Sequence, residues 1–287
     1  MKIAFSTTAC PTWTLEEAAK KAAEFGYLGV ELRSFYDQSV DIASEPFGME
    51  PSAIESIFAD AGVKPISFAT SIKFDKMINP PVVGRIFQNE EAGVGDTKAY
   101  VDLADRTGTQ FVRVFGNNLP AAEPKTWSMR RVTERLTLAA QTARNTDVCV
   151  LIENAGSFAS SSALLELITA ADSTWLGASF NTLASLQSGE CPLDGVKLLG
   201  EHVKVIKICD IDSDGNPTKL GEGVLPLQNF IGALSKMNYT GWIVYEYPKL
   251  WETTGDGLDA NDVLKHAADT LYSWMNAAPA KCTSCSC

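Results

Sequence analysis

The chain has 287 residues, of which 45% are hydrophobic and 21% charged, an ordinary balance for a globular enzyme. This length suits one large barrel or two average domains, and it excludes a small disulfide-stapled fold. Because the formal net charge is −11 and no long basic run is present, the composition disfavours a nucleic-acid backbone as a partner. No apolar run approaches the roughly 20 residues that cross a bilayer. The N-terminus also lacks the apolar core of a signal peptide, so we expect a cytoplasmic protein that does not enter a membrane.

Cysteine usage fits a reducing compartment. Four of the seven cysteines are scattered through the body of the chain: Cys10, Cys149, Cys191 and Cys209. The other three lie in the last residues of the chain: Cys282, Cys285 and Cys287. Three thiols lack the fourth ligand of a structural zinc site, which favours a flexible tail over residues 277–287 rather than a metal clip.

Apolar strand-like runs alternate with amphipathic helical stretches from one end of the chain to the other. The predicted strands span residues 2–6, 28–33, 64–68, 110–115, 147–153, 175–181, 202–208 and 241–246. In the first helical stretch, Thr14 and Glu17 have capping-box spacing, and Gly26 supplies the left-handed residue that ends a helix.

Eight such strand–helix units, joined by short glycine-containing turns, predict right-handed crossovers and a closed (β/α)₈ TIM barrel over residues 1–276. A doubly wound open sheet is the alternative. It is weakened because residues 6–11, after the first strand, are not the glycine-rich loop of a dinucleotide site. Longer insertions at residues 34–51 and 69–89 follow the second and third strands, and we expect them to cover a ligand at the barrel mouth.

Four polar residues stand at the ends of consecutive strand-like runs: Glu153, Asn181, Lys207 and Glu246. In a parallel barrel the C-terminal ends of the strands converge on one pocket. The sequence therefore predicts that these side chains surround one substrate.

Several short segments, in this order and spacing, carry a resemblance to a known family. They are Phe25–Leu32, Val112–Gly116, Leu151–Asn154, Lys207–Asp210, Gly221–Gly223 and Tyr239–Glu246. Over about residues 1–276 the chain resembles the xylose isomerase-like barrel superfamily, the sugar-phosphate isomerases and epimerases that include ketose 3-epimerases and inosose dehydratases. The resemblance implies a small sugar-like or carbonyl substrate, and self-association into a homo-oligomer as an open option. With only two histidines, the chain departs from the histidine-rich zinc cluster of the superfamily's DNA-repair branch.

The resemblance also implies a site. In the family a divalent cation, Mn, Co or Mg, is held by Glu, Asp, His and Glu from the fifth to eighth strands, and the two glutamates move a proton beside a carbonyl. By position Glu153 and Glu246 match. Asn181 stands at the aspartate position and Lys207 at the histidine position.

The lysine decides how this site is interpreted. A protonated ammonium has three donors and no lone pair, so it cannot ligate a cation and would repel one. Three carboxylates and a dication sum to −1, and so do Glu153, Glu246, Lys207 and a neutral Asn181. Our hypothesis is a metal-free centre in which Lys207 replaces the metal and polarises a substrate oxygen, with Glu153 and Glu246 as the catalytic acid/base pair. A Schiff base at Lys207 ranks lower, because two adjacent carboxylates keep the amine charged.

Two further hypotheses stay open. A divalent cation, Mn, Mg or Co, could be retained by Glu153, Asn181, Asp210 and Glu246, giving a metal-dependent keto-sugar isomerase. A non-catalytic barrel that binds a ligand or scaffolds a partner would instead have its pocket closed by a Glu153–Lys207–Glu246 ion network.

Other residues are weighed as substrate contacts. Arg113 either anchors a substrate oxygen or phosphate, or forms a salt bridge to Glu153 or Glu31. For Glu31 itself, a role as the structural partner of such an arginine is favoured over a role as a base. Asn154 orients a loop or a substrate hydroxyl. Trp13 and Phe68 either stack on a substrate ring or pack in the core. The leading hypothesis is an isomerase, epimerase or β-eliminating enzyme that moves a proton next to a carbonyl.

Overall fold

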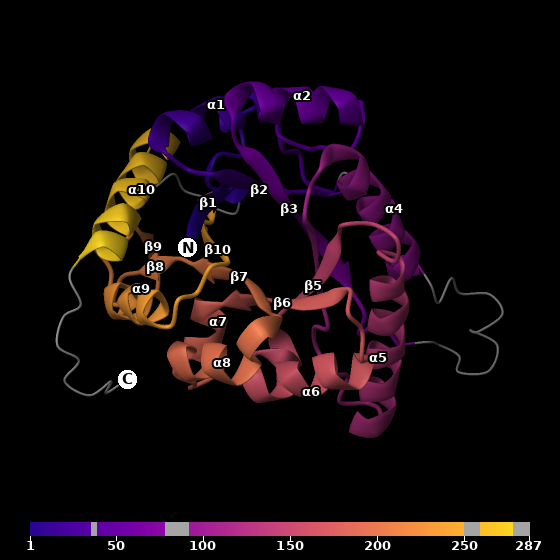
Figure 1. The fold of residues 1–287 in the computed structure, drawn as a ribbon. Coiled ribbons are helices and arrows are strands. Elements are labelled where there is room, and N and C mark those ends of the chain that lie inside the picture. Colours follow the sequence, from indigo (N-terminus) through magenta and orange to yellow (C-terminus); the bar gives the residue numbers. More distant parts are fainter. Residues whose placement is uncertain (36–38, 78–91, 250–258, 278–287) are drawn as a thin grey trace.

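The predicted closed barrel is confirmed. The computed structural model describes residues 1–35, 39–77, 92–249 and 259–277, and in it eight parallel strands close into a ring in the order β1-β10-β7-β6-β5-β4-β3-β2, surrounded by helices (Figure 1). The barrel strands are β1 (Lys2–Ser6), β2 (Gly29–Arg33), β3 (Lys64–Lys73), β4 (Phe111–Phe115), β5 (Cys149–Glu153), β6 (Leu176–Asn181), β7 (Val203–Ile208) and β10 (Trp242–Tyr245). Each lies at a run that the sequence pattern predicts as a strand.

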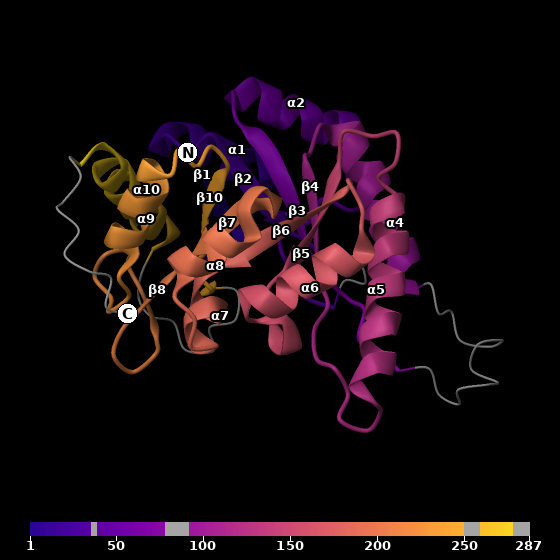
Figure 2. The same cartoon turned by 60° about the horizontal axis from the view of Figure 1, so that its bottom comes forward.

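Helices cover the outside of the ring, as Figure 2 shows from a second direction. They are α1 (Leu15–Phe25), α2 (Pro51–Ala61), α4 (Ala92–Thr107), α5 (Lys125–Gln141), α6 (Ser161–Ala171), α7 (Thr182–Gln187), α8 (Pro192–Leu199), α9 (Leu227–Lys236) and α10 (Ala260–Asn276), with short 3-10 turns η1 (Thr7–Ala9), η2 (Gly156–Phe158) and η3 (Gly200–His202). The predicted caps of α1 are confirmed. The Thr14 side chain accepts a hydrogen bond from the Glu17 amide, and Gly26 ends the helix with φ +83°.

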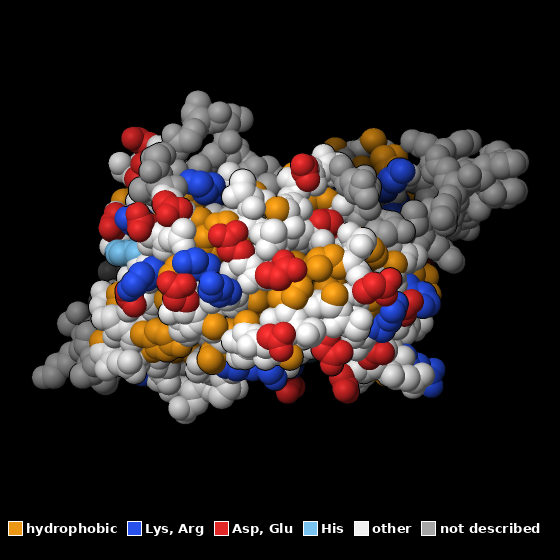
Figure 3. Space-filling view, turned by 90° about the horizontal axis from the view of Figure 1, so that it is seen from above, with side chains coloured by type: hydrophobic (Ala, Val, Ile, Leu, Met, Phe, Trp, Pro, Cys, Tyr) orange, Lys and Arg blue, Asp and Glu red, His pale blue; other side chains and the backbone are white. Residues whose placement is uncertain are grey.

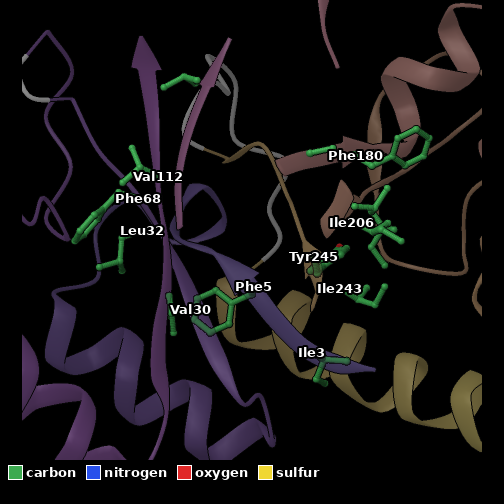
Figure 4. Close-up of a cluster of buried hydrophobic side chains, with 14 of the residues drawn as sticks. Ile3, Phe5, Val30, Leu32, Phe68, Val112, Phe180, Ile206, Ile243 and Tyr245 are labelled. Carbon is green, nitrogen blue, oxygen red and sulfur yellow. The ribbon is translucent and has the colours of Figure 1, made fainter. Parts of the chain in front are cut away.

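Side-chain alternation along the strands produces two separate apolar cores. The larger one lies between the strands and the helices, and it includes Phe68, Val112 and Ile206 (Figure 4). The smaller one fills the inside of the barrel: Ala4, Ile66, Leu151, Val205, Trp242 and Val244, with Phe111 and Cys149 against it. This inner plug lies one pleat closer to the N-terminal ends of the strands than the predicted site residues, so it forms the floor beneath them.

Two features go beyond the predicted pattern. β3 continues to Lys73 with a register shift after Ala69, and a two-stranded hairpin, β8 (Asp210–Ile211) and β9 (Pro217–Thr218), follows β7. The face shown in Figure 3 carries acidic and basic side chains interspersed over its described atoms, without a continuous basic field. No helix in the described ranges is long and apolar enough to cross a membrane.

Part of the predicted mouth insertions and of the tail falls beyond these ranges. Residues 78–89 of the second insertion and the cysteines of the tail lie outside the described residues.

Candidate active site

A fully buried lysine contacts three carboxylates at the C-terminal end of the barrel. The Lys207 Nζ lies 2.5 Å from Glu246 Oε1, 3.0 Å from Glu31 Oε1 and 3.3 Å from Glu153 Oε2. The lysine side chain is 1% exposed, as is that of Glu31, whereas the Glu246 side chain is 21% exposed. Glu246 is therefore the member of this group that is most open to solvent.

Barrel geometry explains why these residues meet. Lys207 is two residues beyond Val205, and Glu153 is two residues beyond Leu151, so each continues the inward face of its strand above the plug. In the ring, Glu246 follows β10, which is next to β7, whereas Glu153 lies on β5, two strands from β7, and Glu31 lies on β2, three strands from β7. A side chain as long as lysine can span the centre and touch all three.

The electrostatic surroundings displace the pKa values of Glu153 and Glu246, the two catalytic candidates, in opposite directions. Burial opposes ionisation of Glu153, but the charges of Lys207 and Arg113 outweigh it and hold the pKa of this carboxyl below its usual value. For Glu246, burial and the negative charges of Glu153 and Glu31 outweigh Lys207, so its pKa is raised. The pKa of Lys207 is also raised: burial favours the neutral amine, but the three carboxylates prevail and keep it an ammonium.

Arg113 forms the salt bridge that was one of its two predicted roles. Its Nε lies 3.3 Å from Glu153 Oε2, and its Nη1 donates to the Thr70 carbonyl oxygen at 2.7 Å. Both charged side chains are nearly inaccessible, at 5% and 6% exposure. Glu153 is thus held between two cations, which explains why it stays ionised.

The two asparagines of the site have mainly positioning roles. Asn181 caps α7 by accepting from the Ala184 amide at 3.1 Å, and its Nδ2 donates to Glu153 Oε1 at 3.5 Å. Asn154 is fully buried and bonds the Asn181 amide at 2.5 Å and the Asn181 carbonyl at 3.0 Å. Of its two predicted roles, the structure therefore places Asn154 in the one that orients a loop.

Comparisons with known proteins agree with this architecture. The family model described as "Xylose isomerase-like TIM barrel" matches residues 19–274. The chain belongs to this family. No curated protein sequence matches it.

Solved structures share the fold at low sequence identity. The L-ribulose 3-epimerase structure superposes with a TM-score of 0.78 at 16% identity, covering 96% of this chain and 95% of that one. The IolI protein with a bound zinc atom gives 0.75 at 14%, covering 96% and 98%. The probable 3-DHS dehydratase AsbF from Bacillus anthracis gives 0.72 at 17%, covering 95% and 99%. At these identities the likeness shows the fold alone.

The residues at the centre of this xylose isomerase-like barrel do not fit the divalent cation that the family implies. The ammonium of Lys207 lies among the carboxylates, and it has no lone pair for a metal. Among the described residues, no three His, Cys, Asp or Glu side chains group as metal ligands would. We therefore derive no chemical step through a metal.

Asp210, named as a ligand in the metal hypothesis, accepts hydrogen bonds from backbone amides instead. Its carboxylate accepts from the amides of Ile211, Gly221, Gly223 and Leu225 at 3.0, 2.9, 3.2 and 3.4 Å. Gly221 has φ +86°, and a Cβ on Gly223 would collide with this carboxylate. The Gly221–Gly223 segment is thus a cradle for a structural aspartate.

Trp13 and Phe68, the aromatic substrate candidates, both lie in the outer core. Phe68 is completely buried, with its ring 6.1 Å from that of Tyr100 on α4 (Figure 4). Trp13 is 7% exposed and belongs to the same core. The structure brings neither residue to the cluster around Lys207, and each has the packing role that was its alternative.

Sequence reasoning missed Arg33 and gave Glu31 a smaller part than it has. Glu31 contacts Lys207. Arg33 lies two residues further along β2, and the negative charges of Glu31, Glu246 and Glu153 act to raise its pKa. Arg33 donates to the Ala69 carbonyl oxygen and to Ser71 Oγ. The available signal was period two in β2, which places Glu31 and Arg33 on one face.

Proposed function

We propose that this barrel is an acid/base enzyme that moves a proton next to a carbonyl of a polyhydroxylated or keto substrate, by isomerisation, epimerisation or β-elimination. Glu153 is the base, Glu246 the acid and Lys207 the electrophile. The observation that carries the proposal is the contact of one ammonium with both glutamates, whose pKa values are displaced in opposite directions. Such a separation is how an environment assigns base and acid roles to two carboxyl groups.

The proposed step begins at Glu153, which accepts the proton from the carbon beside the carbonyl. The C–H electron pair moves into the carbon–carbon bond and the carbonyl pair onto oxygen, giving an enolate whose negative charge the Lys207 ammonium stabilises. Glu246 then donates its proton. Delivery to the original carbon from the other face gives an epimer, and protonation of a departing β-hydroxyl completes an elimination. An isomer forms when the carbon that lost its proton carries a hydroxyl: this hydroxyl passes its proton to the enolate oxygen, its own oxygen becomes the new carbonyl, and Glu246 protonates the former carbonyl carbon.

Lys207 must offer a donor to the substrate for this step. Its ammonium has three donors, and Glu31, Glu153 and Glu246 surround it. Protonation of Glu246 removes the charge that holds the most exposed of these contacts. The substrate oxygen then takes the place of Glu246 at Nζ. A single protonation therefore prepares Glu246 as the acid and frees a Lys207 donor for the substrate.

The family and the fold support this class of reaction, because solved structures of the same architecture include epimerases and a probable dehydratase. The substrate is accordingly proposed to be sugar-like. We also propose that no metal is required, since the ammonium supplies the positive charge that a cation would supply.

Proton exchange with deuterated solvent, followed by NMR over a panel of ketoses and keto acids, tests the function whichever product is formed. K207M should lower kcat by at least about 10²–10³-fold, the effect of removing one oxyanion donor. K204M, whose lysine lies on the same strand and donates to the Glu201 carbonyl, is the matched control and should stay active. Unchanged turnover in K207M rejects the electrophilic role.

Metal analysis is a separate test. Purified protein dialysed against a chelator should keep its turnover, because the positive charge is covalently part of the chain. A stoichiometric transition metal whose removal abolishes turnover would reject the ammonium centre.

A non-catalytic, ligand-binding barrel is the second candidate. The observation that favours it is the saturation of Lys207 by three carboxylates, which would lock the pocket. It gains support if ligands raise the melting temperature but no compound in the panel exchanges a proton with solvent.

A further inference from the structure

One carboxylate of the cluster around Lys207 has no part in the proposed chemistry. Glu31 Oε1 lies 3.0 Å from Lys207 Nζ, and both side chains are 1% exposed. The other two carboxylates, Glu153 and Glu246, are the proposed base and acid. An ionised carboxyl group is costly to bury unless a cation stays in contact with it, so Glu31 and the lysine depend on each other.

The strands on either side of Glu31 place small neutral side chains next to it. Its register partners are Ser6 on β1 and Ser67 on β3, and both serines are fully buried. Arg33, two residues further along β2, is influenced by the charge of Glu31, but it donates hydrogen bonds to two residues of β3. The ammonium of Lys207 is thus the cation that the structure places in contact with the Glu31 carboxylate.

Glu31 contacts the lysine from a different direction than the proposed acid does. β2, which carries Glu31, is three strands from β7, whereas β10, which Glu246 follows, is next to β7. The ion pair with Glu31 therefore draws Nζ toward the centre of the barrel, away from the wall formed by β7 and β10. An electrophile must be held where negative charge develops, and the flexible stem of a lysine does not fix that position by itself.

The charges around Lys207 change during the proposed step. At rest, burial favours the neutral amine, but Glu153, Glu246 and Glu31 together raise the pKa of Lys207 and keep its proton in place. Glu246 is protonated when it is ready to act as the acid, and Glu153 becomes neutral when it accepts the proton of the substrate. At the enolate stage Glu31 is therefore the one of these three carboxylates that still carries a charge.

Arg113 makes this remaining charge more important. Its Nε lies 3.3 Å from Glu153 Oε2, and, like burial, its positive charge acts to lower the pKa of Lys207. Once Glu153 is neutral, its charge no longer separates these two buried cations. Loss of the Glu31 charge would then favour transfer of the ammonium proton to the enolate oxygen, and the neutral amine left behind would no longer stabilise negative charge.

We propose that Glu31 is a positioning residue of the reaction. Its carboxylate holds the Lys207 ammonium at the centre of the barrel, and it remains the counter-charge of that ammonium while both catalytic glutamates carry protons. The catalytic part of this inference rests on the proposed function, whereas the hold of Glu31 on Lys207 does not and can be measured without a substrate.

NMR of the full chain, labelled with ¹⁵N at the lysine side chains, tests this hold. E246Q imitates the protonated acid, and the Lys207 signal is the one that K207M lacks. In E246Q the Glu31 carboxylate should still retain the ammonium, so the ammonium protons should exchange slowly with water. In E31Q/E246Q they should exchange about tenfold faster or more, the effect of losing one charge-assisted contact.

E24Q/E246Q is the matched control for this measurement. Glu24 forms an ion pair of the same length, 3.0 Å, with Lys21, but this pair is exposed on α1. Its removal should leave the exchange of the Lys207 ammonium as slow as in E246Q.

Proton-exchange kinetics test the catalytic part. E31Q should lower kcat about tenfold or more and change KM by less than about twofold, because Glu31 acts when the enolate forms rather than when the substrate binds. E31D keeps the charge on a shorter side chain, so it should recover part of kcat, and it covers the case in which E31Q does not fold. E24Q should have the kcat of the wild-type protein.

Three results overturn the inference: equal exchange in E246Q and E31Q/E246Q, an unchanged kcat in E31Q, or a kcat in E31D as low as in E31Q. The two proposals fail separately. Faster exchange in E31Q/E246Q, in a protein that turns over no compound, keeps the hold of Glu31 on Lys207 and removes the enzyme. Turnover that is equal in E31Q and the wild-type protein removes the role of Glu31 and leaves the enzyme.

Discussion

The Asn154 side chain bonds both the amide and the carbonyl of Asn181, and so ties the end of β5 to the end of β6. The same amide group donates to the Ala159 carbonyl at 3.2 Å. One buried side chain therefore holds the backbone next to Glu153 and the backbone that leads into α7. This connection positions Asn181 against Glu153.

N154A should lower the free energy of unfolding by about 1–3 kcal/mol, because buried backbone groups of Asn181 lose their partners. N276A, at the exposed end of α10, is the control and should change it by less than about 0.5 kcal/mol. Urea unfolding followed by circular dichroism measures both. Equal stability of N154A and the wild-type protein would contradict the clamp.

The pH dependence of stability should have opposite contributions from the two catalytic candidates. Glu153 has a lowered folded pKa, so its contribution is present above the unfolded value of about 4.3 and is lost as pH falls through the folded pKa. Glu246 has a raised folded pKa, so its contribution is present below about 4.3 and is lost as pH rises through its folded pKa.

E246Q removes the second contribution and leaves the first. Urea midpoints measured from acidic to neutral pH should show, in the wild-type protein, a loss of stability above pH about 4.3 that E246Q lacks. E16Q, at an exposed position in α1, controls for the removal of a surface carboxylate. If E246Q shows the same slope as the wild-type protein, Glu246 is not the group that carries the raised pKa.

Asp210 should matter for the 212–224 loop more than for the chemistry. D210A leaves several backbone amides without their charged acceptor, and we expect a loss of about 2–4 kcal/mol together with faster proteolytic cleavage in this loop. D214A, in the exposed tip of the same loop, should change neither. Limited proteolysis with mass spectrometry locates the cut. A fully stable D210A would show that the cradle around Asp210 is dispensable.

Phe68 should influence stability without affecting substrate affinity. F68L preserves an apolar side chain under α4, and it should cost less than about 1.5 kcal/mol. KM for whichever substrate the exchange assay identifies should stay unchanged, since the ring is buried against Tyr100. A KM that rises severalfold would restore the stacking role.

Chain pattern alone was sufficient for the barrel and for the convergence of Glu153, Lys207 and Glu246. Alternation of apolar runs and helices fixes the fold class, and closure of parallel strands brings their polar ends together. Period two places Glu31 and Arg33 on one face of β2, but the contact of Glu31 with Lys207 also depends on the stagger between strands, which a local pattern does not show.

Irregularities of the backbone explain why Phe68 and Asp210 lie away from the cluster around Lys207. The register of β2 against β3 shifts between Val30 and Glu31, so Phe68 is level with the outward-facing Leu32, and Ala69 with Arg33. Period two in the sequence cannot locate that shift. Asp210 is separated from the end of β7 by a single residue, Cys209, and begins the β8–β9 hairpin, so nearness in sequence to Lys207 did not bring it to the centre.

The apolar plug beneath the cluster has a consequence for isotope labelling. With Trp242 and Val244 in the floor, the Glu246 carboxyl, which is 21% exposed, is the most solvent-accessible group of the cluster around Lys207 and can exchange its proton with bulk water. The Glu153 side chain is only 6% exposed, and a bound substrate would separate it further from water. Tritium abstracted by Glu153 would then stay on that carboxyl until the product leaves, while the hydrogen that Glu246 delivers to the product would come from water.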